Sequence, residues 1–236
     1  MKAMVALCAC LFLHLNVFAQ FKILMQFKNY AGDELLQTQH EYNNAAGEKF
    51  TIRNLRYYIS NIILKNGLQT ETHDEYLLID ESDSASKSKV LDTKLQHINA
   101  VEFLIGVDSV KNVSGVQTGN LDPARGMFWT WNTGYVMAKL DGNSLVAKTP
   151  QHTFSFHVGG YKTGEQTARS VTLNLPVAID CSKDDATLVV KADVLKWFNG
   201  IHLIKIEASP LCHEPGSLAV MLADNYATMF SVEQEQ

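Results

Sequence analysis

Short runs in which apolar and polar residues alternate are the feature that most constrains the fold of this 236-residue chain. Alternation with a period of two is typical of β-strands that bury one face, and turn signals separate the runs. Segments with a helical period are scarce. The pattern therefore predicts an all-β protein, an antiparallel β-sandwich. The predicted strands cover residues 21–27, 49–52, 55–65, 76–79, 100–105, 135–140, 152–158, 171–178 and 187–192.

Two short segments favour helix. Asp193 can cap a helical turn over residues 194–198, which Asn199 and Gly200 would end. The stronger candidate is near the C-terminus, where Ser217 can cap a helix and apolar residues recur at 218, 221, 222 and 229. We therefore expect a short C-terminal helix beside the sandwich.

The N-terminus has the pattern of a processing segment. Lys2 is followed by an almost wholly apolar run that ends in Val17-Phe18-Ala19, a small-residue cleavage site. This predicts a signal peptide over residues 1–19, a single domain over residues 20–236 and a periplasmic or extracellular location. The alternative is a lipoprotein cleavage box at Cys10, but the apolar run continues past it. No later segment is apolar enough to predict a membrane span.

Charge and motif content exclude several functions. The formal net charge is −5, and the leader carries Lys2 but no acid, so the exported part is slightly more acidic. A nucleic-acid-binding protein normally shows a basic patch, so we expect no nucleic-acid partner. The chain contains no HExxH, GxSxG, P-loop or GxGxxG motif. We therefore predict a protein that is not an enzyme.

Cysteines suggest a covalent link. Cys8 and Cys10 belong to the leader, which leaves Cys181 and Cys212. A pair of cysteines in an exported protein predicts a disulfide. The alternative is a thiolate copper site, because soft sulfur suits Cu(I). In that case His213, directly after Cys212, becomes a candidate metal ligand.

Residues 127–135 read Met-Phe-Trp-Thr-Trp-Asn-Thr-Gly-Tyr and include two of the three tryptophans. In a strand, Met127, Trp129 and Trp131 would share one face. A thioether and two indoles on one face form an oxidisable surface that suits a metal. The alternative is that these side chains fill the core, since aromatic residues are enriched in strands.

His157 is the histidine that the predicted hairpin brings to this surface. Residues 141–144 read as the turn. If the turn centres between about residues 143 and 146, His157 lies opposite a residue between 129 and 135, because opposite residues of an antiparallel pair have a constant index sum. Its strand places it on the polar face. Imidazole suits copper, so His157 is a candidate ligand; the alternative is a hydrogen-bonded surface histidine.

Several stretches together resemble the MbnP-like family of copper-binding, secreted bacterial β-sandwich proteins. The stretch Met-Phe-Trp-x-Trp-x-x-Gly-Tyr is the most specific of them, and together they span nearly all of the chain after the leader. The matching stretches are residues 55–61, 76–80, 105–108, 122–135, 154–160 and 223–230.

The resemblance implies copper handling outside the cytoplasm. It also implies that a dihaem partner enzyme, related to cytochrome c peroxidases, oxidises one tryptophan to kynurenine, which then binds copper together with histidines. Carried over to this chain, Trp129 or Trp131 is the modified residue and His157 the expected copper ligand. Met127 and His213 complete the candidate metal ligands. The competing hypothesis is a recognition module that stacks a carbohydrate or another partner on Trp129 and Trp131.

Overall fold

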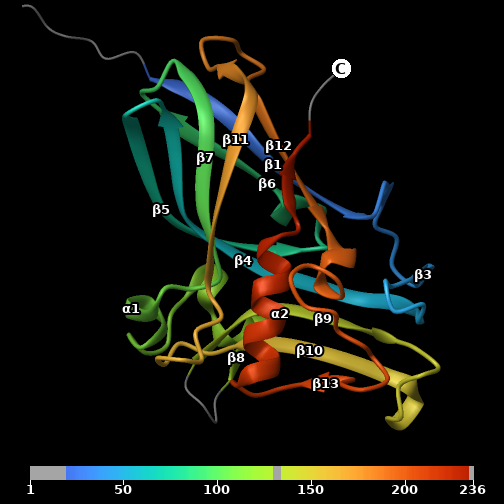
Figure 1. The fold of residues 1–236 in the computed structure, drawn as a ribbon. Coiled ribbons are helices and arrows are strands. Elements are labelled where there is room, and N and C mark those ends of the chain that lie inside the picture. Colours follow the sequence, from blue (N-terminus) through green and yellow to red (C-terminus); the bar gives the residue numbers. More distant parts are fainter. Residues whose placement is uncertain (1–19, 130–133, 234–236) are drawn as a thin grey trace, which may run out of the picture.

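Two sheets packed face to face form the protein in a computed structural model that describes residues 20–129 and 134–233 (Figure 1). Within these residues the smaller sheet has five strands in the order β14-β12-β1-β2, with β6 beside β1. Their bounds are β1 Phe21–Ala31, β2 Glu34–Leu35, β6 Ser88–Thr93, β12 Thr187–Asp193 and β14 Phe230–Val232.

The larger sheet has nine strands in the described residues, with the central order β11-β7-β4-β9-β10-β13. Strands β3 and β5 also pair with β4, and β8 pairs with β9. Their bounds are β3 Glu41–Asn43, β4 Lys49–Asn66, β5 Gln69–Asp80, β7 His97–Ile105, β8 Phe128–Trp129, β9 Gly134–Asn143, β10 Thr153–Gly159, β11 Arg169–Asp180 and β13 Leu211–Cys212.

The predicted fold class, a β-sandwich with a short C-terminal helix, is confirmed. The sheets are mainly antiparallel, with two parallel pairs: β1 with β12 and β10 with β13. The C-terminal helix is α2 (Ser217–Ala227); its N-cap is Gly216 rather than Ser217, and no side chain caps it. The other helical segments are α1 (Ser109–Asn112) and 3₁₀ turns over Ser84–Lys87, Gly119–Leu121, Pro123–Arg125, Pro150–His152 and Val194–Trp197.

Strand β4 organises the larger sheet. The two strands predicted over residues 49–52 and 55–65 form one strand of 18 residues, which pairs with β3, β5, β7 and β9. Its pairing shifts near Arg53 and near Asn61, where the backbone takes a positive φ of 50°. Such bulges increase the local bend of a strand. They let one continuous strand pair with β3 and β9 along its first half and with β5 and β7 along its second half.

Two apolar clusters hold the sheets. The main cluster fills the space between them, and aromatic side chains such as Phe50 and Phe198, with ring centroids 4.7 Å apart, lie at its centre. The adjacent residues Tyr57 and Tyr58 are both fully buried but belong to different clusters. The larger sheet is therefore covered on both faces. The second cluster contains Tyr58, Leu78, Val107, Leu121, Met127, Trp129, Tyr135, Val136 and Met137.

The β9–β10 hairpin differs from the prediction. Gly142 and Asn143 continue β9 instead of forming a turn, and residues 144–152 make the connection. An added Cβ at Gly142 would lie 1.9 Å from the carbonyl oxygen of Thr51 and 2.5 Å from the Phe154 ring. Gly142 therefore serves close packing within the sheet. Because the turn comes later, His157 lies opposite Lys139 and not opposite residues 129–135.

The predicted disulfide is wrong. Cys181 and Cys212 are both free and buried. Cys181 directly follows β11 at the top of Figure 1, whereas Cys212 lies in β13 at the bottom. A disulfide requires the two Cα atoms to lie within about 7 Å of each other. Burial raises the pKa of each thiol to about 11, so both remain protonated at neutral pH.

No helix in the described part of the chain has the length and apolar character needed to cross a membrane.

Thiol titration checks the state of the cysteines. In protein expressed from residue 20 and purified without reductant, we expect two reactive thiols after denaturation and slow reaction in the native state, because both are buried. We also expect the urea midpoint to be the same with and without reductant. A pair that reacts only after reduction would instead indicate the disulfide.

Candidate functional site

Polar side chains gather on the outer face of the larger sheet, where β9, β10 and β13 lie side by side at the bottom of Figure 1. Along β10, Ser155 and His157 alternate with buried residues. On β9, Lys139 and Asp141 lie opposite His157 and Ser155. This face carries the histidine that the sequence singled out.

The residue that follows strand β13 is a second histidine, His213. Strand β13 pairs in parallel with β10, so that Cys212 lies beside Phe156 and both side chains belong to the main core. Since successive residues of a strand point to opposite faces, His213 emerges on the outer face beside His157. The two imidazole rings lie 4.7 Å apart between centroids, at 39° to each other.

Two buried polar side chains, those of Asn225 and Glu48, bind the backbone of the segment that leads to β13. Asn225 in α2 accepts hydrogen bonds from the backbone of Ile201 and His202. Glu48 accepts from the backbone of Ile206 at 2.7 Å and of Glu207 at 2.9 Å. These bonds satisfy backbone donors that would otherwise cost free energy on burial. They also fix the path of the chain that leads to His213.

Asp141 is the centre of the polar cluster. Its Oδ1 accepts hydrogen bonds from Ser155 Oγ at 2.5 Å and from His157 Nε2 at 2.9 Å, and its Oδ2 accepts from Asn54 Nδ2 at 2.9 Å. Burial alone would raise the pKa of Asp141, but the hydrogen bonds from His157, Ser155 and Asn54 outweigh burial and hold it well below the usual range. The carboxylate is therefore ionised under all ordinary conditions.

His213 is joined to the same cluster through Ser155, whose Oγ lies 2.9 Å from His213 Nε2. Partial desolvation of the ring, followed by repulsion from His157, lowers the pKa of His213. The imidazole is therefore neutral at neutral pH. A neutral imidazole is the form that can donate a lone pair to a metal.

Trp129 lies near this cluster. An added Cβ at Gly159 would meet Cζ3 of the Trp129 indole at 2.7 Å, so the absence of a side chain at Gly159 makes room for that ring. Gly159 follows His157 by two residues on β10, a separation of about 6.5 Å along a strand. Trp129 is 8% exposed, and Met127 is fully buried in the same cluster. Both side chains therefore fill an apolar cluster, and the Trp129 indole offers no exposed stacking platform.

The candidate ligands fall into three groups. The structure brings His157 and His213 together, and it places Met127 and Trp129 in the second apolar cluster. Trp131 lies in residues 130–133, outside the described residues. Across residues 20–129 and 134–233, no group of three or more His, Cys, Asp or Glu side chains is arranged to hold a metal ion.

Three residues of the polar cluster were not predicted from the sequence as site residues: Asp141, Ser155 and Asn54. Asp141 was assigned to a turn because Asp-Gly-Asn is a strong turn signal. Ser155 has the period-two spacing from His157 that marks a shared face, which was the one available indication. The hydrogen bond between Asn54 and Asp141 depends on the pairing of β4 with β9, and no local sequence pattern predicts that pairing.

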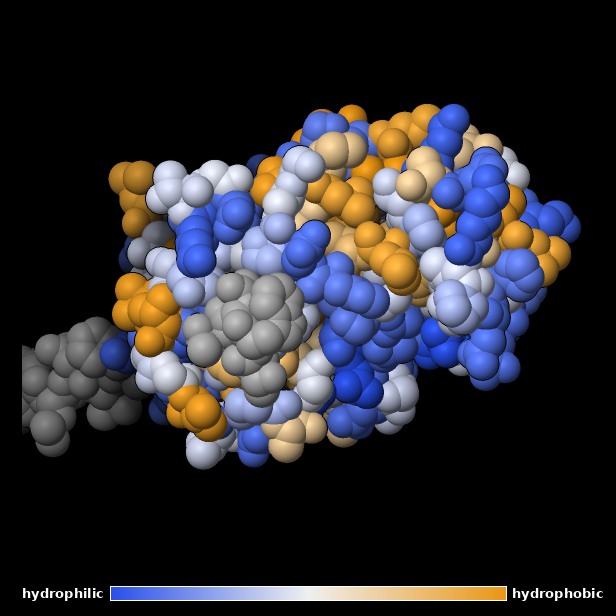
Figure 2. Space-filling model, turned by 90° about the horizontal axis from the view of Figure 1, so that it is seen from below, coloured by the Kyte–Doolittle hydropathy of each residue, from blue (hydrophilic) through white to orange (hydrophobic). Residues whose placement is uncertain are grey.

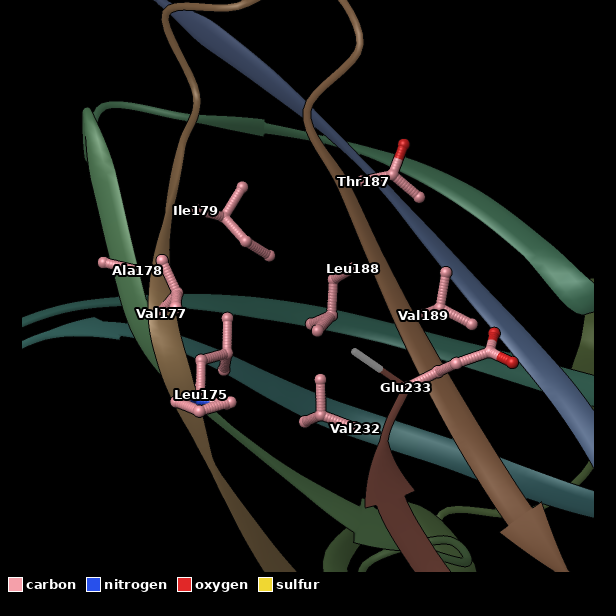
Figure 3. Close-up of a pocket in the computed structure, with 10 residues that line it drawn as sticks. Leu175, Val177, Ala178, Ile179, Thr187, Leu188, Val189, Val232 and Glu233 are labelled. Carbon is pink, nitrogen blue, oxygen red and sulfur yellow. The ribbon is translucent and has the colours of Figure 1, made fainter. Parts of the chain in front are cut away.

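An apolar groove lies elsewhere in the molecule, between β11, β12 and β14, and has a volume of about 300 Å³ (Figure 3). Aliphatic side chains such as Leu175, Ile179 and Leu188 line it, with Glu233 at one edge, and no histidine is among its lining residues. The end of the molecule that carries β10 and β13, seen in Figure 2, shows hydrophobic patches separated by hydrophilic residues. The polar cluster on β9, β10 and β13 is therefore the better candidate for a metal.

Comparison with known proteins gives two matches. The family model described as MbnP matches residues 21–214. Among solved structures, MbnP from Methylosinus trichosporium is similar, with a TM-score of 0.61 and 14% identity, over 91% of this chain and 98% of that chain. At this identity the structural match shows a shared fold alone. The search of curated proteins finds no match.

Replacing Asp141 by asparagine tests the cluster through its pH dependence. Because the folded-state pKa of Asp141 lies below that of an unfolded aspartate, ionisation stabilises the folded protein above about pH 4 and this stabilisation is lost as the pH falls further. We expect Asp141→Asn to lower the free energy of unfolding at pH 7 by about 1–3 kcal/mol, as for lost hydrogen bonds to a charged group. The difference from wild type should shrink below about pH 4.

Urea unfolding across this pH range measures the effect. Asp33→Asn is the control, because the Asp33 side chain is fully exposed, and we expect a change within about 0.5 kcal/mol at every pH. A difference between Asp141→Asn and wild type that does not depend on pH would contradict the assignment.

Proposed function

Because this chain belongs to the MbnP family, we propose that it is an exported copper-binding protein without catalytic activity, in which His157 and His213 donate to the copper. We propose that the leader over residues 1–19 directs it to the periplasm or the cell exterior. The copper is its cargo, taken up for acquisition, storage or delivery.

The proximity of two imidazoles on one exposed face is the observation that carries the proposal. Their centroids lie 4.7 Å apart, and His157 is hydrogen-bonded to a carboxylate. Histidines that bind metals characteristically donate their second ring nitrogen to a carboxylate or a carbonyl. Imidazole nitrogen is a suitable donor for copper, and the lowered pKa of His213 favours the unprotonated ring.

The groups around the two histidines also determine which donor atoms a metal would meet. Lys139 lies opposite His157 and donates to the carbonyl of Gly126 at 2.6 Å. Asp141 supplies the nearest negative charge, but its oxygens are occupied by three hydrogen-bond donors. The available donors are therefore neutral imidazole nitrogens, which suit copper. Mg²⁺ and Ca²⁺ prefer oxygen ligands and would suit this site less well.

A third donor would come from an oxidised tryptophan. An indole donates its N–H and offers no lone pair in the ring plane, so unmodified Trp129 is a poor ligand. Adding two oxygen atoms across the indole C2–C3 bond, from two molecules of hydrogen peroxide that leave as water, gives N-formylkynurenine. Hydrolysis then releases formate and leaves a ketone and an aniline nitrogen, both able to bind copper.

We assign this modification to Trp129 because its ring lies over Gly159, two residues along β10 from His157. A dihaem enzyme related to cytochrome c peroxidases is the proposed oxidising partner, since it would use hydrogen peroxide as the oxidant.

Copper titration tests the ligands. We expect His157→Ala and His213→Ala each to weaken copper binding by at least about tenfold, because loss of groups that merely orient a ligand already costs about 10–100-fold. Competition with a chelator of known copper affinity measures the effect, with both Cu(I) and Cu(II). His97→Ala is the matched control, since His97 is exposed on β7, away from β10 in the sheet order. Equal affinity of wild type and both site variants would remove these histidines from the site.

Peptide mapping of protein from its native host tests the tryptophan. We expect the peptide that contains Trp129 to show the mass change for replacement of one carbon by one oxygen, as in kynurenine. Trp197 is buried in the main core and is the internal control, expected to be unmodified. The same mass change at Trp131 would move the modification to residues 130–133, and two unmodified tryptophans would overturn this part of the proposal.

A further inference from the structure

A single carboxylate reaches both histidines of the proposed copper site. Asp141 Oδ1 lies 2.9 Å from His157 Nε2 and 2.5 Å from Ser155 Oγ, and Ser155 Oγ lies 2.9 Å from His213 Nε2. Thus Nε2, and not Nδ1, is the ring nitrogen that faces the protein in both residues. The arrangement has consequences for which ring nitrogen carries the proton.

The proton on His157 follows from the chemistry of its partner. An aspartate is ionised at neutral pH and can only accept hydrogen bonds. The close contact between Asp141 and His157 therefore requires a proton on His157 Nε2. A neutral imidazole has one N–H, so the Nδ1 of His157 carries the lone pair.

The position of the proton on His213 is set indirectly, through the hydrogen bond between Ser155 and Asp141. Ser155 has one hydroxyl proton, and the carboxylate of Asp141 at 2.5 Å is its strongest acceptor, because charge-assisted hydrogen bonds are the stronger ones. The Ser155 oxygen can then only accept from His213, which places a proton on His213 Nε2. The Nδ1 of His213 is therefore also left with its lone pair.

We propose that Asp141 is the positioning residue of the site: through Ser155 it sets the same tautomer in His157 and His213, so that both donate to copper through Nδ1. The inference rests on the proposed copper function for its purpose, but the tautomers are a property of the metal-free protein. Asn54, which donates to Asp141 Oδ2 at 2.9 Å, holds the carboxylate in place from β4.

The two histidines are connected to Asp141 in different ways. Asp141 contacts His157 directly, whereas it acts on His213 only through Ser155. Ser155 Oγ also lies 3.0 Å from His157 Nε2. Removing Ser155 therefore takes one contact from each ring, but His157 keeps its direct hydrogen bond to Asp141, so we expect Ser155→Ala to release the tautomer of His213 and to leave that of His157 unchanged. Removing Asp141 should remove the constraint on the tautomers of both His157 and His213. A merely structural role of either residue would not produce this difference between the two histidines.

Nitrogen NMR of the metal-free full chain after the leader tests the proposal. At about pH 8.5, two units above the usual histidine pKa, the wild-type spectrum should show a protonated Nε2 and an unprotonated Nδ1 for both rings. In Ser155→Ala, the His213 nitrogens should shift towards averaged values, while those of His157 keep the pattern of a protonated Nε2 and an unprotonated Nδ1, because Asp141 still accepts from that ring. In Asp141→Ala, both rings should show averaged values; alanine is used because an asparagine amide could still accept from His157.

Asp180→Ala is the matched control, because Asp180 also accepts a serine hydroxyl, from Ser182 at 2.6 Å, but lies at the end of β11. We expect it to leave the nitrogen shifts of His157 and His213 unchanged. Circular dichroism and urea unfolding establish that each variant is folded; should Asp141→Ala fail to fold, the contrast between the two rings in Ser155→Ala decides the question.

Copper titration of the same variants distinguishes the positioning role of Asp141 from the proposed copper function. We expect Asp141→Ala to weaken copper binding by about 10–100-fold, as for the loss of other groups that orient ligands. Wild-type protein that binds no copper would overturn the proposed function and leave the tautomer result standing. Wild-type rings protonated on Nδ1, or rings unaffected by both variants, would overturn the positioning role of Asp141 even if copper binds.

Discussion

The hydrogen bonds that converge on Asp141 are the interaction on which the candidate site depends. They join side chains of β4, β9 and β10 directly, and through Ser155 they reach the segment after β13. A half-buried carboxylate is stable there because three donors compensate its lost hydration. The same bonds make the imidazoles of His157 and His213 a pair with a defined orientation, instead of two separate surface histidines.

The rest of the fold brings these groups together. Close packing at Gly142 extends β9 far enough to place Asp141 within the sheet, beside β4 and β10. Glu48 and Asn225 hold the long connection that returns the chain to β13. The site is therefore assembled from elements far apart in the sequence, and its geometry follows from sheet packing and from buried polar anchors that contact neither histidine.

Local patterns predicted the strands well, because alternation of apolar residues directly reflects a half-buried sheet. They failed where tertiary packing overrides a local preference: Asp141 and Gly142 have turn chemistry, yet both pair with β4 and β10 as part of β9, and Gly142 packs closely against Thr51 and the Phe154 ring. The disulfide prediction failed because a cysteine count says nothing about distance. His213 was considered only for its neighbour Cys212, and the parallel pairing of β13 with β10 sends these two side chains to opposite faces.

A crystal structure of the copper-loaded protein, with anomalous data at the copper edge, would show whether His157 and His213 bind the metal and through which ring nitrogens. We expect a copper ion bound to Nδ1 of both His157 and His213, with both Nε2 atoms still hydrogen-bonded to the Asp141–Ser155 pair. Copper bound through Nε2, with the contacts to Asp141 and Ser155 broken, or copper located away from β10 and β13, would contradict it.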